Sequence, residues 1–308
     1  MTALYAMPGN EAFADRLSRY AALPRRELQL HRFPDRESLV QLAAPLAQEE
    51  VALVCTLADP DGKVVPLLMA AATLRELGAV RVGLIAPYLA YMRQDTRFHP
   101  GEAVSARIFG KLLGEAFDWL ITVDPHLHRL HSLEQAWPLD GHVVHAATQV
   151  AAWIDHNVVS PLIIGPDGES AQWVRDVARR LDAPFVVASK QRHGDRDVQV
   201  TLAGIEPWQG HTPVLVDDII SSGQTMIEAL RSLDLKAPAP VCIGVHGVFA
   251  PGAVRELRAA GASRIVTSNT IEGDTALIDI STDVADVLIA LAQRQGTVPP
   301  SSNKDNRP

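Results

Sequence analysis

Short apolar segments alternate with longer amphipathic segments along most of the chain, and this alternation limits the possible folds more than any other feature. The short segments have the length and residue types of buried strands, and the segments between them show helical periodicity. Strands that alternate with helices predict parallel sheets covered by helices on both faces, so we expect an α/β protein. The predicted strands are Val51–Leu57, Arg81–Ala86, Trp119–Val123, Leu162–Gly165, Phe185–Ser189, Val214–Val216, Val241–His246 and Arg264–Ser268. The predicted helices are Val64–Leu77, Val104–Gly114, Ala171–Leu181, Thr225–Leu233 and Pro251–Ala260.

The alternation runs twice, which predicts two domains, each with a mainly parallel sheet flanked by helices. One set of predicted strands ends near Val123 and a second begins near Leu162, in a chain whose 308 residues suffice for two domains. We place these domains at residues 1–145 and 146–294, and the final apolar helix, Val284–Ala292, is compatible with packing on either one. The tail at residues 295–308 is polar and rich in proline and serine, and we expect it to be disordered.

The segment before the first of these strands has a different pattern. Glu27–Phe33 and Ser38–Leu42 are two extended segments separated only by the turn residues PDRE. Such a pattern predicts a hairpin or an edge ribbon.

The charge and hydropathy of the chain exclude several classes of protein. The formal net charge of −8 argues against non-specific binding to nucleic acids, because no overall basic field attracts phosphates. No stretch reaches the roughly 18 to 20 apolar residues that cross a bilayer, and the first residues lack the pattern of a signal peptide. We therefore expect a cytoplasmic protein. Cys55 and Cys242 lie in apolar, strand-like segments, and we expect both to be buried and reduced.

The segment VDDIISSGQT, at Val216–Thr225, places two acidic residues before a turn of small and hydroxyl-bearing residues. In such a turn, the backbone N–H groups and the following helix N-terminus form an anion site. Asp217 and Asp218 would repel a phosphate that touched them, but they suit neutral hydroxyl groups beside it, and a sugar phosphate offers both. The segment is neither a Walker A sequence nor a dinucleotide fingerprint. A simple helix cap would not need paired aspartates.

This segment resembles the phosphoribosyl diphosphate loop of type I phosphoribosyltransferases, and the whole chain resembles the ribose-phosphate diphosphokinases (phosphoribosyl pyrophosphate synthetases). The resemblance implies two phosphoribosyltransferase-like domains. It also implies a reaction in which ribose 5-phosphate takes the diphosphoryl group of Mg-ATP, which gives phosphoribosyl diphosphate and AMP for nucleotide biosynthesis. The segments that match the family in order and spacing are RFPDRES at Arg32–Ser38, PYLAYMRQDTRFHPGEAVSA at Pro87–Ala106, TVDPHLH at Thr122–His128, GPDGES at Gly165–Ser170, SKQR at Ser189–Arg192, VDDIISSGQT, and GVHGVFAPGA at Gly244–Ala253.

The matching segments also imply which residues bind the two substrates. ATP-binding residues are expected in two groups, of which the first comes from a loop that in this family reaches into the ATP site of a neighbouring subunit. The family therefore implies a homo-oligomer, at least a dimer, and many of its members are hexamers. The first ATP group is Phe33, Asp35 and Glu37, the second is Arg93, Gln94 and Asp95, and the residues expected to bind ribose 5-phosphate are Asp217, Asp218, Ser221, Ser222, Gly223, Gln224 and Thr225.

Two further sets of residues carry the expected chemistry. The resemblance implies that His126 and Asp167 bind Mg²⁺; the nearby His128 and His131 suggest zinc, but no partner with zinc spacing accompanies them. Lys190 and Arg192 stand two residues apart at a strand end, so they project to the same side. In the family the matching residues are the catalytic pair. No residue is assigned as a general base.

The chain also departs from the family pattern at three places, and these departures keep two other functions open. Arg36 and Gln224 replace glycines, and Gly168–Ser170 replaces a run of smaller residues. Arginine takes a positive φ less easily than glycine, so the hairpin tip is expected to differ. The alternatives are a catalytically silent paralogue that regulates an active synthetase, and a phosphoribosyltransferase that consumes phosphoribosyl diphosphate.

Overall fold

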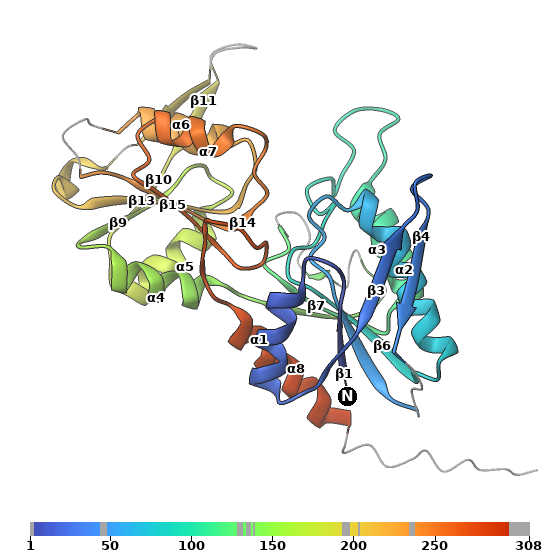
Figure 1. The fold of residues 1–308 in the computed structure, drawn as a ribbon. Coiled ribbons are helices and arrows are strands. Elements are labelled where there is room, and N and C mark those ends of the chain that lie inside the picture. The colour runs from blue at the N-terminus through green and yellow to red at the C-terminus, as the bar shows by residue number, and fades with distance from the viewer. Residues whose placement is uncertain are drawn as a thin grey trace, which may run out of the picture.

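The computed structural model describes residues 3–43, 48–127, 132–133, 137, 139–192, 198–202, 204–233 and 238–295. It contains two six-stranded sheets and two antiparallel ribbons (Figure 1). The tail that the sequence predicts to be disordered lies outside the described residues from residue 296 onward.

The first sheet is parallel and has the strand order β2-β1-β5-β6-β7-β8. Side chains alternate between its faces: Leu4 packs under one layer of helices and Tyr5 under the other. Helices α2 and α3 cover one face, and α1 covers the opposite face. The strands are β1 (Ala3–Ala6), β2 (Arg25–Arg26), β5 (Glu50–Val54), β6 (Arg81–Ala86), β7 (Trp119–Val123) and β8 (Asp140–Val144), and the helices are α1 (Glu11–Ala21), α2 (Asp61–Glu76) and α3 (Ser105–Ala116).

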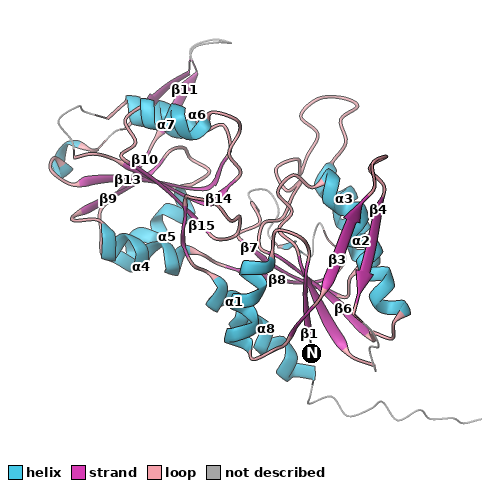
Figure 2. Cartoon of the chain, viewed as in Figure 1, coloured by secondary structure: helices cyan, strands magenta, loops and turns pink. Residues whose placement is uncertain are grey.

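The second sheet repeats this plan with the strand order β10-β9-β13-β14-β15-β16, again with parallel pairs. Helices α4 and α5 pack on one face, and α6 and α7 pack on the other (Figure 2). The strands are β9 (Pro161–Gly165), β10 (Phe185–Val187), β13 (Thr212–Ile220), β14 (Val241–Gly247), β15 (Arg264–Ser268) and β16 (Ala276–Ile278), and the helices are α4 (Ala147–Asn157), α5 (Ala171–Leu181), α6 (Gln224–Arg231), α7 (Ala253–Ala259) and the short 3₁₀ helix Glu206–Trp208.

Each sheet is accompanied by one antiparallel ribbon. In the first half of the chain, β3 (Leu28–Arg32) pairs with β4 (Ser38–Leu42), which confirms the hairpin predicted from the sequence. In the second half, β11 (Ser189–Arg192) pairs with β12 (Val198–Thr201). The fold class predicted from the sequence, two α/β domains with parallel sheets flanked by helices, is confirmed.

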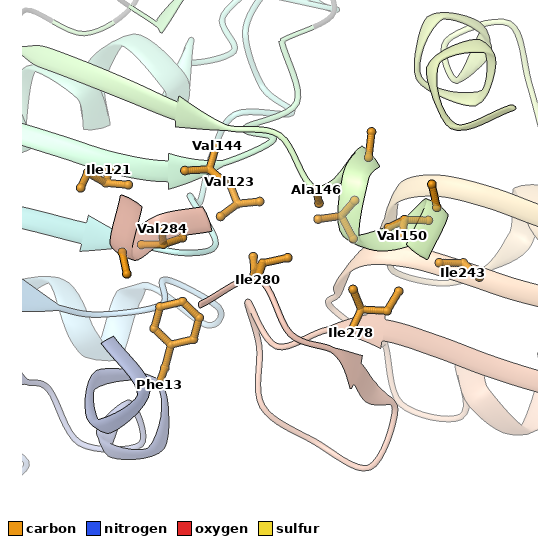
Figure 3. Packing of buried hydrophobic residues seen from close by; sticks show 14 of the residues in the cluster. Phe13, Ile121, Val123, Val144, Ala146, Val150, Ile243, Ile278, Ile280 and Val284 are labelled. Atoms are coloured by element: carbon orange, nitrogen blue, oxygen red, sulfur yellow. The ribbon is translucent and has the colours of Figure 1, made fainter. Parts of the chain in front are cut away.

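A continuous apolar core joins the two sheets. Val123 and Val144 of the first sheet lie in the same cluster as Val150 of α4 and Ile243 of the second sheet (Figure 3). The C-terminal helix α8 (Ser281–Gln295) follows the second sheet in sequence but packs against α1 and contacts β7 and β8. The chain therefore returns to its first sheet at the end, and the division at residues 145 and 146 stays a prediction.

Three strand predictions were wrong at their ends. The predicted strand Val214–Val216 continues through both aspartates to Ile220, because the neighbouring β14 is long enough to pair with Ile219 and Ile220. The predicted strand Phe185–Ser189 is interrupted at Ala188: β10 stays in the sheet, and β11 leaves it to form the ribbon. The predicted strand Val51–Leu57 ends at Val54. The elements β1, β2, β8, β12, β16 and α1 were not predicted.

Within the described residues, no helix combines the length and the apolar character that crossing a membrane requires.

Candidate active site

A cavity of about 530 Å³ lies where the carboxyl ends of the two sheets meet. Its walls come from the loop after β7, from the β8–α4 connection, from α5 with its preceding loop, and from β13. In open parallel sheets, the carboxyl ends of the strands are the usual place for ligands. Residues from both halves of the chain therefore face one space, among them Asp124, His126, His145, Glu169, Ser170, Asp217 and Asp218.

Asp217 and Asp218 lie inside β13, and both line this cavity. The backbone N–H of Asp218 donates to Oδ1 of Asp217 at 3.0 Å. Burial raises the pKa of the Asp217 carboxyl well above its ordinary value, and the negative charges of Asp218 and Asp167 raise it further. The aspartates therefore form a concentrated acidic site that a cation or hydroxyl donors would stabilise.

His126 contacts Asp218 across the junction between the two sheets. Its Nδ1 lies 2.5 Å from Oδ2 of Asp218, and both side chains are mostly buried. Because a carboxylate only accepts, Nδ1 carries the hydrogen and the lone pair of a neutral ring is on Nε2. This contact joins a residue of the TVDPHLH segment to a residue of the VDDIISSGQT segment, which are 92 positions apart in the sequence.

Asp167 stands after β9 and organises the loop that begins α5. Its Oδ1 accepts the backbone N–H groups of Glu169 at 3.1 Å and Ser170 at 3.2 Å. Its charge reaches the second sheet's acidic site, since it contributes to the raised pKa of Asp217. Glu169 lines the cavity, so it adds a further carboxylate to the acidic residues there.

The turn at Ser221–Thr225 has the backbone expected of an anion-binding loop. Gly223 has a φ of 74° and precedes the first residue of α6. A Cβ on Gly223 would stand 3.1 Å from the Leu257 side chain, so the positive φ favours glycine and the space beside it is tight. Gln224 turns its amide along the helix and donates to Glu228 at 3.0 Å. Of the described residues, those that line the cavity reach this segment only at Asp217 and Asp218.

The segment after β6 places its polar residues differently. Arg93 is exposed. The pKa of Tyr88 is raised, mainly by burial; the positive charge of Arg93 opposes this shift, and the negative charge of Asp218 adds to it. Arg93 therefore belongs to the electrostatic surroundings of Asp218. Gln94 is half-buried and donates from Nε2 to the carbonyl of Thr96 at 3.3 Å. Asp95 is buried.

The tip of the β3–β4 ribbon is not part of the cavity within this chain. Phe33 is 41% exposed, and the backbone N–H of Glu37 donates to Oδ1 of Asp35 at 3.1 Å. Arg36 has a φ of 73°, so a non-glycine residue takes the left-handed conformation here, and the expectation that the tip differs from the family pattern stays a prediction. The turn is closed by two backbone bonds of 2.9 Å, from Phe33 N to Glu37 O and from Arg36 N to Phe33 O, which compensate for the strain of a non-glycine residue.

Lys190 and Arg192 lie in β11, where the backbone pairs them with Val200 and Val198 of β12. The positions of their side chains lie outside what the structure describes, as do residues 193–197 and the histidines His128 and His131. The catalytic role expected of this pair stays a prediction.

Three residues of the junction, Asp124, His145 and His246, were not predicted from the sequence. Asp124 accepts from Nδ1 of His145 at 2.9 Å and from the backbone N–H of Ala146 at 2.9 Å. His246 is buried at the end of β14. The only signal in the sequence was the position of Asp124 and His246 at strand ends, because their partners come from distant segments.

The donor set of the cavity fits magnesium. Within the described residues, no three histidine, cysteine, aspartate or glutamate side chains form a ready group for a metal ion. Asp217 and Asp218 supply carboxylate oxygens inside the cavity, and the charge of Asp167, which does not line the cavity, also acts on Asp217. A divalent cation would relieve the repulsion among these three carboxylates. Mg²⁺ commonly uses one or two carboxylates and completes its shell with waters and substrate phosphates.

Both halves of the chain match known families. Residues 2–116 match the N-terminal domain of ribose phosphate pyrophosphokinase, and residues 141–282 match the phosphoribosyl transferase domain. A ribose-phosphate pyrophosphokinase of Saccharolobus solfataricus is 33% identical over 278 residues, which cover 87% of this chain and 94% of the relative. The enzyme of the same name from Pyrococcus abyssi is 28% identical over 93% of this chain and 97% of the relative.

The architecture agrees with these sequence relationships. The phosphoribosylpyrophosphate synthetase of Mycobacterium smegmatis superposes with a TM-score of 0.82 at 21% identity, over 96% of this chain and 100% of that one. The family and the enzyme class predicted from the sequence are confirmed. The chain belongs to the ribose-phosphate pyrophosphokinase family.

Proposed function

We propose that this chain transfers the β,γ-diphosphoryl group of Mg-ATP to the anomeric hydroxyl of ribose 5-phosphate, in the cytoplasm and as a homo-oligomer. The observation that supports this most directly is the contact of His126 with Asp218, because it brings a residue of each domain to one cavity. A phosphoribosyltransferase would need only the second of these domains. Family membership covers both halves of the chain.

Ribose 5-phosphate binds along the segment from Asp217 to Thr225. The backbone N–H groups of the Ser221–Thr225 turn, together with the N-terminus of α6, take the 5-phosphate. Ser221, Ser222 and Thr225 add hydroxyl donors. Asp217 and Asp218 accept hydrogen bonds from the ribose hydroxyls, which orients the anomeric oxygen. Gln224 leaves this turn clear, since its amide is held by Glu228.

ATP binds on the side of the cavity near Arg93, Gln94 and Asp95. Arg93 is exposed and near enough to act on Tyr88, so its guanidinium is able to meet phosphate oxygens. The exposed Phe33, with Asp35 and Glu37, lies at the ribbon tip outside this chain's own cavity. We assign that tip to the ATP site of a neighbouring subunit, which makes the active assembly at least a dimer and permits a hexamer.

His126 and Asp167 hold Mg²⁺ with the ATP phosphates. Bound there, the ion would neutralise phosphate charge and fix the orientation of the β-phosphorus. The acidic surroundings of Asp217 favour a cation at this place. The positive charges of Lys190 and Arg192 then stabilise the oxygens around the transferred group and the leaving AMP.

The reaction forms one bond and breaks one. The anomeric oxygen of ribose 5-phosphate bonds to the β-phosphorus of ATP, while the bond from that phosphorus to the bridging oxygen of the α-phosphate breaks. The bridging oxygen leaves with AMP, and the hydroxyl proton passes to the surroundings. Positioning and charge stabilisation are sufficient for this type of transfer.

One assay tests the proposal against its alternatives. The purified chain, incubated with ribose 5-phosphate and Mg-ATP, is expected to form AMP and phosphoribosyl diphosphate in equal amounts. A silent regulatory paralogue would form neither product while an active synthetase in the same buffer forms both. A phosphoribosyltransferase would instead consume added phosphoribosyl diphosphate when a purine or pyrimidine base is supplied.

A further inference from the structure

The segment GVHGVFAPGA has no role in the proposed reaction, yet it contains a buried histidine at the junction of the two domains. His246 ends the buried part of β14 and is 1% exposed. Its ring contacts Tyr88 of the first domain edge-on, with centroids 5.0 Å apart. A residue of the second sheet thus reaches the carboxyl end of the first.

The hydrogen bonds of His246 determine its tautomer. Nε2 lies 3.0 Å from the carbonyl oxygen of Val123 and 3.2 Å from that of Asp124. Carbonyl oxygens only accept, so Nε2 must carry a hydrogen and donate to them. Nδ1 lies 2.9 Å from Oγ1 of Thr270, and burial lowers the pKa of the ring. A neutral ring therefore donates through Nε2, and its Nδ1 faces the Thr270 hydroxyl, which also lies 3.2 Å from the carbonyl oxygen of Val245.

The two carbonyls that His246 contacts begin a strained loop. Asp124 has a φ of 31° and His126 a φ of 53°, although neither is glycine. Such residues persist only where the surroundings determine their conformation. The carbonyl of Asp124 accepts the backbone N–H of His126 at 2.9 Å in addition to His246. The carboxylate of Asp124 is held separately by His145 and Ala146.

A second link from the same residue pair supports this assignment. The carbonyl of Thr270, whose hydroxyl meets His246, accepts the hydroxyl of Thr56 in the first domain at 2.6 Å. His246 and Thr270 thus connect the second sheet to the ends of both β5 and β7. Packing alone would be satisfied by an apolar residue, which would leave the carbonyl of Val123 without this donor.

We infer that His246 is a positioning residue that holds the strained loop at residues 124–126, so that His126 stands against Asp218. The role is indirect: His246 acts through the backbone of the first domain and does not touch the substrates. This inference rests on the proposed function only for its effect on catalysis. The tautomer and the contact across the domains stand independently of it.

The variants His246→Ala and His246→Gln test this role, with Val266→Ala as the matched control. Val266 is fully buried in the neighbouring β15, so its truncation creates a similar core defect without touching the loop. We expect His246→Ala to lower kcat about 100-fold, the effect of a misplaced group, with KM for ribose 5-phosphate unchanged. His246→Gln restores most of that loss, because its amide offers a donor and an acceptor. Val266→Ala lowers Tm and leaves kcat unchanged.

Wild-type kcat in His246→Ala, or a loss of kcat in Val266→Ala equal to that in His246→Ala, would overturn the positioning role. If His246→Ala does not fold, His246→Leu takes its place, because it fills the buried space without a donor; a kcat equal to that of His246→Gln would then overturn the positioning role.

A spectroscopic measurement on the wild-type protein addresses the contact itself. Histidine ¹⁵N correlation spectra are expected to show one buried ring in the neutral Nε2–H form, with a slowly exchanging ring proton that His246→Gln removes. A ring protonated at Nδ1 would contradict the inference even if the synthetase reaction is observed. Absence of the reaction with the expected tautomer would instead contradict the proposed function.

Discussion

The loop after β7 and the turn after β13 both bring the backbone to positive φ just beyond a strand, but they do so by different means. The turn after β13 uses Gly223, which takes a φ of 74° without strain. The loop after β7 uses Asp124 and His126, which require hydrogen bonds from other segments. The first loop is therefore encoded locally, whereas the second depends on the assembled domains.

Because of this difference, we expect the two loops to affect different steps: the turn after β13 the binding of the sugar phosphate, and the loop after β7 the placement of His126 against Asp218. The turn at Ser221–Thr225 lies within one domain, so its conformation does not depend on how the domains meet. His126 reaches Asp218 only if the second domain holds the loop of the first. We expect damage to the first turn to weaken sugar-phosphate binding, and damage to the second loop to lower turnover.

The largest effect is expected at Asp218, where the two regions meet. Asp218→Ala removes the partner of His126 and a ribose contact at once. We expect kcat/KM to fall by about 10²- to 10³-fold, as for the loss of one electrostatic group in an active site. Steady-state kinetics with both substrates varied would measure this. The charge-matched control is Asp15→Ala, which removes an exposed pair with Arg25 and should leave kcat/KM unchanged; a loss below tenfold at Asp218 would remove this residue from the site.

An intermediate effect is expected at Gly223. Alanine there must take a left-handed conformation, which costs about 1 to 2 kcal/mol, and it also meets Leu257. The turn will shift, so ribose 5-phosphate should bind roughly tenfold more weakly by calorimetry, which corresponds to about 1.4 kcal/mol. Gly261 has a φ of 111° and open space around it, so Gly261→Ala supplies the same type of strain away from the site. Equal affinities for the two variants would show that the turn is not the phosphate site.

The smallest effect is expected at His145, which holds the carboxylate of Asp124. The hydrogen bond to Asp124 raises the pKa of His145 above its ordinary 6.5. Because the folded pKa exceeds the unfolded one, this stabilisation is complete below pH 6.5 and disappears as the pH rises through the folded pKa. His145→Gln should therefore lower the free energy of unfolding at about pH 5.5 by less than about 1 kcal/mol, since the pair is screened, and should have no effect at about pH 8.5.

Urea titrations of both proteins at the two pH values would measure that difference. A deficit in the variant that is larger at high pH than at low pH would contradict the assigned direction of the pKa shift. A deficit well above the expected size would mean that His145, rather than His246, is the main support of the loop.

Most of the fold was predictable because its signals are local. The alternation of apolar and amphipathic segments predicted β6, β7 and β15 with their observed bounds. The length of β13 was not predictable in this way, because two adjacent aspartates resemble a strand end. They remain in the strand because β14 continues to supply backbone partners beside them.

In the candidate site, too, the residues with local sequence signals were predictable, and those that depend on distant partners were not. Gly223 was recognisable as part of an anion-binding turn, since a glycine before a helix has few other local explanations. The role of His246 was not recognisable, although its segment had been noticed. A buried histidine is defined by its hydrogen-bond partners, and two of these, the carbonyls of Val123 and Asp124, come from residues more than 100 positions away.

The sequence by itself determined the two parallel sheets, the ribbon at β3–β4, the turn before α6 and the family, because periodicity, turn residues and motif order are properties of neighbouring residues. Only the tertiary structure decided that α8 returns to the first sheet and that His126 meets Asp218. Only it decided that Arg36, Asp124 and His126 adopt positive φ. The reason is that such conformations are unfavourable in isolation and become stable when hydrogen bonds compensate for their strain, from within the turn at Arg36 and from other segments at Asp124 and His126.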